Sequence, residues 1–435
     1  MNVCIVGLGK IGLPLSLQIA HRGHHTIGLD IDDHLIDLVN RGEEPFPGEP
    51  GLVDRLVAAR AAGTFHATSD VQSAVSVADV VVIVVPLVVD EAKKPDFDAL
   101  DAATRAIAPH LRPDSLVSYE TTLPVGTTRN RFTAMLAEGS GLEPGVDLYV
   151  CFSPERVSSG RVFDDLGRYP KLVGGIDDES GVRAVDFYEA VLEFNARPDL
   201  DRENGVWNVG NAEAAELVKL AETTYRDVNI ALANEFAVYA ERLGVSVFEV
   251  IDAANSQPFS HIHQPGIAVG GHCIPVYPHL YLHTDPAARM PAASRFVNDS
   301  MPAHAAETLS ALIGDLEGKK VVVLGAAYRG GVKETAFSGV FPTVAALEQL
   351  GAVVTVHDPL FDNDELEALG FSSYALGDPV EAAIVQTDHE QYRRLTAADL
   401  PGVEGVVDGR NLLDSLQWRG WGVDVRTIGS GATPS

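Results

Sequence analysis

The residue with the clearest capacity for chemistry is Cys273, in the segment GIAVGGHCIPVYP at residues 266–278. Glycines and a proline around it disfavour a regular helix or central strand, so the sulfur is predicted to stand on a constrained loop. Such a loop lets a ligand approach backbone N–H groups that can stabilise an oxyanion, and a charged His272 would favour the thiolate. The alternative for a lone cysteine is a small buried thiol that only fills space.

The other two cysteines have different surroundings. Cys4 falls in the apolar run at residues 3–6 and Cys151 in the run at residues 148–152, so both are predicted to be buried strand residues. Three cysteines in 435 residues form neither a disulfide framework nor a Cys/His metal pattern, so no metal is expected. Cysteines without a disulfide framework, together with an N-terminus that opens on a strand rather than on a basic signal segment, indicate a cytoplasmic protein.

Composition and charge narrow the function classes. With 435 residues, 46% of them apolar, the chain can form two or three domains with real cores. Its longest apolar stretches, such as residues 80–89, are too short for a membrane span. A formal charge of −29 argues against nucleic-acid and anionic-membrane partners. A phosphorylated ligand would therefore need helix N-termini and a few well-placed cations.

The N-terminal segment has a dinucleotide-binding pattern. An apolar strand at residues 1–6 runs into GLGKIG, and residues 13–20 have helical apolar spacing. In such a turn the first glycine bends the chain, the second admits a pyrophosphate and the third packs helix on strand. A second strand at residues 26–29 ends in Asp30, whose carboxylate suits a ribose and repels a 2′-phosphate, so NAD is favoured over NADP. The cofactor candidates are Gly7, Gly9, Lys10, Ile11, Gly12 and Asp30.

Further strands are predicted at residues 79–86, 116–121 and 148–152, which makes the first domain a doubly wound sheet. The loops TTLPVGTT and SPER follow two strand ends, where ligands bind in such sheets. Residues 211–242 contain no Gly or Pro and predict one helix of about 48 Å. Its Lys219 is either an exposed lysine or a cation directed into an inter-domain cleft.

The α/β pattern restarts after a helix predicted at residues 302–316. Strands are expected at residues 319–324, 352–356 and 403–408, with a glycine-containing turn at residues 325–331. This part lacks GxGxxG, so it is predicted to bind a nucleotide in another way. Residues 429–435 are small and polar and are expected to be disordered.

Taken together, several motifs resemble the UDP-glucose/GDP-mannose dehydrogenase family. In chain order they are GLGKIGLP with Asp30, TTLPVGTT, SPER, ELVKLAE, GGHCIPV and YRGGVKET, and the likeness runs from Asn2 to about Leu413. SPER and RDVNIALANE are closest to the branch that acts on UDP-N-acetylhexosamines, such as UDP-N-acetylmannosamine dehydrogenases. The resemblance implies an α/β fold with two Rossmann-like doubly wound parallel-sheet domains joined by a long central helix.

The same resemblance implies an activity. It is the NAD-dependent, two-step oxidation of the C6 alcohol of a UDP-sugar to a carboxylate, in polysaccharide biosynthesis, by a homodimer. The implied domains are residues 1–205 for NAD, 206–300 as a central helical domain with the cysteine loop, 301–420 for the UDP-sugar, and 421–435 as a tail.

Site residues carry over by position in these motifs. Cys273 matches the nucleophile, which adds to an aldehyde so that a thiohemiacetal can yield a thioester. Lys219 matches the lysine that faces the reacting oxygen, and Thr122 and Glu155 match residues associated with a catalytic water. Thr223 completes the catalytic candidates, and Thr122 is also a cofactor candidate. The substrate candidates are Glu155, Arg156, Lys219, Gly270, His272, Tyr328 and Lys333.

Three positions depart from the family pattern. Thr223 replaces a frequent Asn and Tyr277 a frequent Asp, which bears on oxyanion binding and thioester hydrolysis. Ala336 replaces a common Arg, which bears on nucleotide contacts.

Two rival interpretations stay open at this level. One is a one-step NAD-dependent hydroxyacid dehydrogenase, which would need neither Cys273 nor a second α/β domain. The other is a catalytically silent NAD-binding protein. The sugar itself is not specified by the sequence, and Phe259, His261 and His263 are only candidates for reading it.

Overall fold

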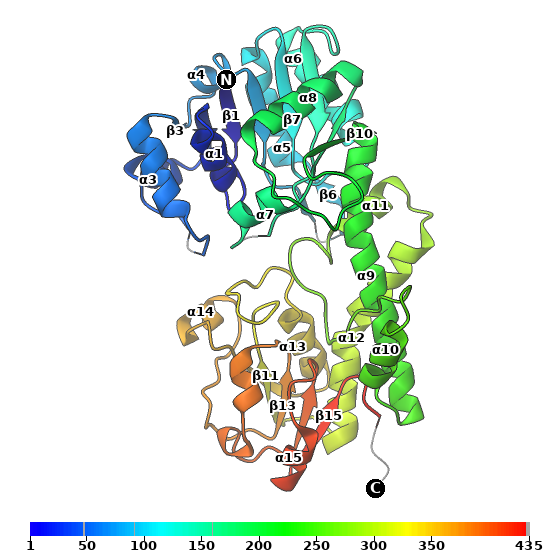
Figure 1. Cartoon of the computed structure of the whole chain (residues 1–435). Helices are drawn as coiled ribbons and strands as arrows, with labels where there is room; N and C mark the ends of the chain where they lie inside the picture. The colour runs from blue at the N-terminus through cyan, green and yellow to red at the C-terminus, as the bar shows by residue number, and fades with distance from the viewer. Residues whose placement is uncertain (47, 91, 159, 432–435) are drawn as a thin grey trace. The chain divides into compact units, whose positions relative to one another are not determined.

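The computed structural model describes residues 1–46, 48–90, 92–158 and 160–431, which form two compact units (Figure 1). Unit 1 is Met1–Ala221 and unit 2 is Glu222–Ser435. The boundary falls within α9 (Ala212–Leu243), the long green helix of Figure 1. The uninterrupted helix predicted at residues 211–242 is therefore confirmed.

Unit 1 is built on an eight-stranded sheet with the order β10-β9-β8-β7-β4-β1-β2-β3. All neighbours pair in parallel except β8 with β9. The inner strand β1 is apolar from Val3 to Val6 because both its faces are buried there: Val3 and Ile5 enter one core, and Cys4 and Val6 the other. The strands are β1 (Asn2–Val6), β2 (His25–Leu29), β3 (Phe65–Thr68), β4 (Val80–Ile83), β7 (Ser115–Tyr119), β8 (Leu148–Phe152), β9 (Lys171–Gly175) and β10 (Val206–Asn211).

Helices connect these strands, as parallel pairing requires. Asp32 is the N-cap residue of α2, because its carboxylate accepts the backbone N–H groups of His34 and Leu35. A short hairpin, β5 (Val88–Val89) with β6 (Pro95–Asp96), follows β4. The helices are α1 (Gly12–His21), α2 (Asp33–Arg41), α3 (Leu52–Ala62), α4 (Val71–Val75), α5 (Asp98–Ile107), η1 (Ala108–His110), η2 (Thr128–Thr133), α6 (Ala134–Ser140), α7 (Val162–Arg168) and α8 (Asp178–Val191).

Unit 2 contains a five-stranded parallel sheet in the order β12-β11-β13-β14-β15. Alternate residues of β11 again enter two cores, Val321 and Val323 on one face and Val322 and Leu324 on the other. Its strands are β11 (Lys320–Leu324), β12 (Val353–His357), β13 (Ala382–Val385), β14 (Gly405–Asp408) and β15 (Asp424–Thr427). Its helices after α9 are α10 (Val247–Asn255), α11 (Tyr277–Thr284), α12 (Arg289–Ile313), α13 (Val340–Gln349), α14 (Asn363–Ala368), η3 (Glu390–Arg394), η4 (Ala397–Asp399) and α15 (Ser415–Gly420).

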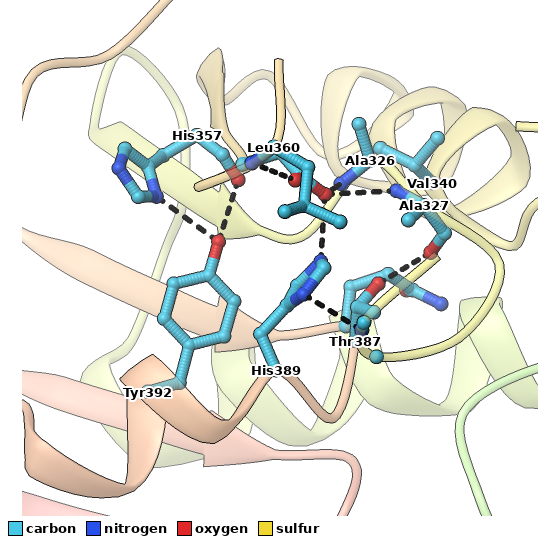
Figure 2. A network of polar contacts seen from close by, with 12 residues as sticks. Ala326, Ala327, Val340, His357, Leu360, Thr387, His389 and Tyr392 are labelled. Atoms are coloured by element: carbon cyan, nitrogen blue, oxygen red, sulfur yellow. Dashed lines mark hydrogen bonds and ion pairs between the residues drawn. The ribbon is translucent and has the colours of Figure 1, made fainter. Parts of the chain in front are cut away.

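A buried polar network closes the carboxyl end of this second sheet (Figure 2). The carboxylate of Asp358, directly after β12, accepts the backbone N–H groups of Ala326 at 2.8 Å and Ala327 at 2.9 Å. His389 Nε2 lies 2.9 Å from the same carboxylate, and Thr387 donates its hydroxyl to the carbonyl of Ala327. The network fixes the turn after β11, at residues 325–331.

Two sequence predictions need correction. Helix α12 begins at Arg289 and contains Pro302 in its interior, whereas the sequence predicted a helix that starts at Pro302. The C-terminal residues are also more ordered than expected: β15 lies within the segment assigned to a tail, Gly429 donates to Glu241, and Ser430 bridges to Ser246. Residues 432–435 of the predicted disordered tail lie outside the described residues. The four-part domain division stays a prediction.

Candidate active site

The turn after β1 has the geometry of a dinucleotide cradle. Gly7 has a φ of 95°, which favours glycine, and a Cβ on Gly12 would lie 1.8 Å from the Gly7 carbonyl oxygen. A Cβ on Gly9 would meet nothing within 4 Å, so open space lies beside that backbone. The Asp30 carboxylate accepts the backbone N–H of Leu8 at 2.6 Å and thereby ties the end of β2 to the turn. These residues fit a dinucleotide.

The remaining cofactor candidates adjoin this turn or the next strand end. Lys10 is exposed, and Ile11 is the N-cap residue of α1. Thr122 is buried just after β7, in a loop whose Gly126 donates its backbone N–H to the Glu216 carboxylate of α9. Burial raises the pKa of Glu216 to about 7, against the effect of the backbone hydrogen bonds that it accepts.

Lys219 is buried, so its interpretation as an exposed lysine is wrong. Its Nζ donates to the backbone carbonyl of Glu155, which lies in the loop after β8. The structure thus brings together two candidates that are far apart in sequence. Thr223, one turn further along α9, is also buried.

The Glu155 carboxylate is held from several sides. It accepts the backbone N–H groups of Arg156 at 2.6 Å and Val157 at 3.0 Å, and the Lys171 ammonium lies at 3.1 Å. Arg156 itself donates to the carbonyl of Pro170. A shallow recess of about 10 Å³ borders Glu155, Arg156 and Lys171.

Sequence reasoning missed three buried residues behind Glu155: Glu120, Lys171 and Tyr188. Lys171 Nζ lies 3.0 Å from Glu120, and the Tyr188 hydroxyl donates to Glu120 at 2.6 Å. One available signal was the placement of Lys171, one of only eight lysines, directly before the apolar run of Leu172 and Val173.

The cysteine loop belongs to unit 2 and is irregular, as predicted. Cys273 is partly exposed, whereas Cys4 and Cys151 are buried, also as predicted. Gly271 donates its backbone N–H to the carbonyl of Ala336 at 2.9 Å, and Arg410 donates to the carbonyl of Ala268. The loop is therefore fixed against the turns of the second sheet.

Close packing explains the glycines of this loop. A Cβ on Gly270 would lie 2.6 Å from the Cβ of Tyr328, and Gly271, with a φ of 92°, faces the same ring. The structure thus places the substrate candidates Gly270 and Tyr328 in direct contact. His272 is exposed, with its Nε2 3.9 Å from Glu334, and Tyr277 is the first residue of α11.

Other candidates in unit 2 lie apart from this contact or have structural partners. Lys333 pairs with Glu365 and lies over the Phe361 ring. Phe259 is largely exposed, and the backbone of His263 donates to Asn229. Neither observation assigns a sugar-reading role.

Within the described ranges, no group of three or more His, Cys, Asp or Glu side chains is arranged to hold a metal ion. Helices in the same ranges all lack the combination of length and apolar character that a membrane crossing requires.

Comparison with known proteins gives three matches along the chain. Models of the UDP-glucose/GDP-mannose dehydrogenase family match residues 1–192 as the NAD binding domain, 213–299 as the central domain and 322–415 as the UDP binding domain. The UDP-N-acetyl-D-mannosamine dehydrogenase of Methanococcus maripaludis is 30% identical and covers 99% of this chain and 97% of its own. That of Pyrococcus horikoshii is 33% identical, covering 95% and 96%.

Solved structures show the same likeness. The Pyrococcus horikoshii UDP-D-ManNAc dehydrogenase superposes with a TM-score of 0.86 at 32% identity, covering 99% of this chain and 100% of its own. The NDP-N-acetyl-D-galactosaminuronic acid dehydrogenase of Methanosarcina mazei Go1 gives a TM-score of 0.85 at 28% identity, covering 99% and 96%. The predicted pair of Rossmann-like domains with a long central helix is confirmed.

Proposed function

Because this chain belongs to the UDP-glucose/GDP-mannose dehydrogenase family, we propose that it oxidises the C6 alcohol of a UDP-N-acetylhexosamine to the carboxylate in two NAD-dependent steps. The observation that carries the proposal is the partly exposed Cys273 on a loop fixed against the domain that matches the UDP-binding model. The sugar class is supported by full-length relatives named UDP-N-acetyl-D-mannosamine dehydrogenase.

In the first oxidation, the C6 hydroxyl proton passes to solvent and C6 loses a hydride, while Lys219 provides a fixed positive charge for the C6 oxygen. When bound, NAD supplies the hydride acceptor for both oxidations, and the turn at residues 7–12 with Asp30 would hold it.

In the second oxidation, the Cys273 thiolate forms a C–S bond with the aldehyde carbon. The resulting thiohemiacetal loses hydride and becomes a thioester. Water, oriented by Thr122, then breaks the C–S bond of the thioester. The water oxygen enters the carboxylate, one of its protons goes to Glu155 and the other to solvent, and the thiolate is restored. Each sugar therefore yields two NADH and one carboxylate.

The test is product stoichiometry with UDP-N-acetylmannosamine, UDP-N-acetylglucosamine and UDP-glucose under anaerobic conditions. Wild type should form two NADH per uronate with one of these sugars and release no aldehyde. Cys273→Ala should bind NAD but lose nearly all net acid formation, and so should Cys273→Ser, because a hydroxyl is a far weaker nucleophile at neutral pH.

Two results would contradict the proposal. One NADH per substrate, or acid production by Cys273→Ala at the wild-type rate, would favour a one-step dehydrogenase. No NADH with any sugar would favour a silent NAD-binding protein.

We also propose a homodimer built on α9. Its exposed large apolar residues, which include Leu217, Tyr225, Tyr239 and Leu243, recur at spacings that place them along one stripe of the helix. Light scattering should give twice the chain mass, and Tyr239→Glu should lower it. A cytoplasmic location is supported by the cysteines, which are all unpaired thiols.

A further inference from the structure

We propose that Glu120 and Lys171 act with Glu155 as one proton-accepting unit, so that the water that cleaves the Cys273 thioester gives its proton to a pair of carboxyls rather than to one. Glu120 and Lys171 are positioning residues in this scheme, and the inference rests on the proposed function.

The three side chains form a compact buried cluster from three neighbouring strands of unit 1. Lys171 opens β9, and its Nζ lies 3.0 Å from Glu120 and 3.1 Å from Glu155. Glu120 follows β7, and Glu155 lies just beyond β8. The exposed fractions of the side chains are 5% for Lys171, 0% for Glu120 and 13% for Glu155, so only Glu155 has appreciable access to solvent.

The two carboxyls also act on each other, because both lie about 3 Å from the same ammonium, and the charge of Glu155 raises the pKa of Glu120. Two like charges this close repel each other in a buried site, which favours a state in which one of the two carboxyls carries a proton. One ammonium faces two carboxyls, and the cluster is neutral when it holds that proton. A buried group of charges favours the neutral state.

A second chain of hydrogen bonds supports Glu120 from behind. The Tyr188 hydroxyl donates to Glu120 at 2.6 Å, so the Ser118 hydroxyl, 2.7 Å away, donates to Tyr188. The titratable or charged groups that face the two carboxyls are Lys171, Tyr188, Cys151, Arg156 and Lys219.

The pKa values of the two carboxyls are shifted in opposite directions. Burial raises the pKa of Glu120 to about 7, and the Lys171 charge only partly offsets this. Burial would also raise the pKa of Glu155, but Lys171 and the hydrogen bonds that Glu155 accepts hold it well below its usual value. A carboxylate with so low a pKa is a weak base for water by itself.

The electrostatic coupling between Glu120 and Glu155 explains how Glu155 can still act as a base. Above neutral pH both carboxyls are ionised, and the like charge of Glu120 makes Glu155 a stronger base than its own surroundings would allow. The proton taken from water is then shared between the two carboxyls while the C–S bond breaks, and it returns to solvent through the exposed edge of Glu155.

The experiment measures thioester hydrolysis against pH by rapid quench, with the first NADH burst recorded in the same samples. In wild type, hydrolysis should rise with pH through about 7. Glu120→Gln removes the like charge, so the midpoint should fall by about one pH unit or more and the plateau rate roughly tenfold. Lys171→Met should move the midpoint upward, Lys171→Arg should restore it, and the first burst should persist.

Glu216→Gln is the matched control, because Glu216 is another buried carboxyl of unit 1 whose pKa is raised to about 7. It should leave the midpoint in place. Tyr188→Phe, which only removes a donor to Glu120, covers the case in which the charge variants do not fold, and it should raise the midpoint.

An unchanged pH profile in Glu120→Gln or, if that variant does not fold, in Tyr188→Phe would overturn the inference, and so would a shift caused by Glu216→Gln. If wild type forms no second NADH, the proposed function itself fails, which is a distinct result.

Discussion

Replacement of Asp358 by alanine should destabilise unit 2 and loosen the cysteine loop at the same time. Asp358 accepts the backbone N–H groups of Ala326, Ala327 and Leu360, and His389 Nε2, at 2.8 to 2.9 Å (Figure 2). The turn that it holds carries Tyr328, whose ring packs on the glycines before Cys273. NADH formation should therefore fall while NAD binding, which needs unit 1, persists.

The magnitude follows from the number of donors left without an acceptor. Ala326, Ala327 and His389 are all at most 1% exposed, whereas Leu360 is partly exposed and can find water. Each buried unsatisfied donor costs roughly 1–3 kcal/mol. Water that enters the vacated space offsets part of this, so we expect a loss of roughly 3–5 kcal/mol in the free energy of unfolding.

The assay is urea unfolding followed by tryptophan fluorescence, since Trp418 and Trp421 lie in unit 2 and only Trp207 in unit 1. Asp362→Ala is the control: this N-cap residue of the exposed helix α14 should contribute only about 1 kcal/mol. If Asp358→Ala costs no more than Asp362→Ala, the network does not support the turn.

Asp358 should also make the stability of unit 2 depend on pH. Burial would raise the pKa of Asp358, but its hydrogen bonds with His389 and the backbone lower it from 3.8. A carboxyl with a lowered pKa in the folded state stabilises above its unfolded value, and that contribution disappears as pH falls through the folded pKa. The stability difference between wild type and Asp358→Ala should therefore be constant above about pH 5 and shrink below pH 3.8.

Two further predictions concern the cofactor turn. Gly12→Ala should lower the melting temperature of unit 1 and abolish NAD binding, because its Cβ would overlap the Gly7 carbonyl, whereas Gly9→Ala should weaken NAD binding without loss of stability. Calorimetry and NAD titration would separate these effects. Equal behaviour of the two variants would contradict the roles given to the two glycines. Asp30→Asn keeps an acceptor for Leu8 but removes the charge, so the preference for NAD over NADP should fall about tenfold in kcat/KM, and an unchanged ratio would show that Asp30 does not set it.

The parts of the fold that the sequence predicted are those with strong local signals. Strand β1 is an unbroken apolar run before a glycine turn, and α9 is a long segment without Gly or Pro. Some of the strands that escaped prediction are short: β3 reads FHAT and β13 reads AAIV, and four residues hold too little pattern to separate strand from loop. Strands β9 and β10 are longer but were also missed. Pro302 led to a wrong helix boundary, because a proline is typical of a helix start but here lies within α12.

The candidate site divides in the same way. Cys273 and the glycines around it could be found because chain neighbours create their environment. Lys171 offered only its place before an apolar run, since its burial depends on Glu120 and Glu155, which lie well before it in sequence and meet it only across the sheet. Arg410 was missed for the same reason: it reaches the carbonyl of Ala268 from the loop after β14.

The two sheets share one hydrogen-bonding arrangement, but the aspartate in it has a different exposure in each. In each, an aspartate after the second strand accepts backbone N–H groups from the turn after the first: Asp30 from Leu8, and Asp358 from Ala326 and Ala327. Asp30 is partly exposed, so its carboxylate can also accept from a ribose. Asp358 is buried against His389, and its oxygens are already engaged within the protein. The second turn therefore cannot present its aspartate to a ribose, which gives a physical reason why NAD selects the first sheet although both sheets have a Rossmann-like topology.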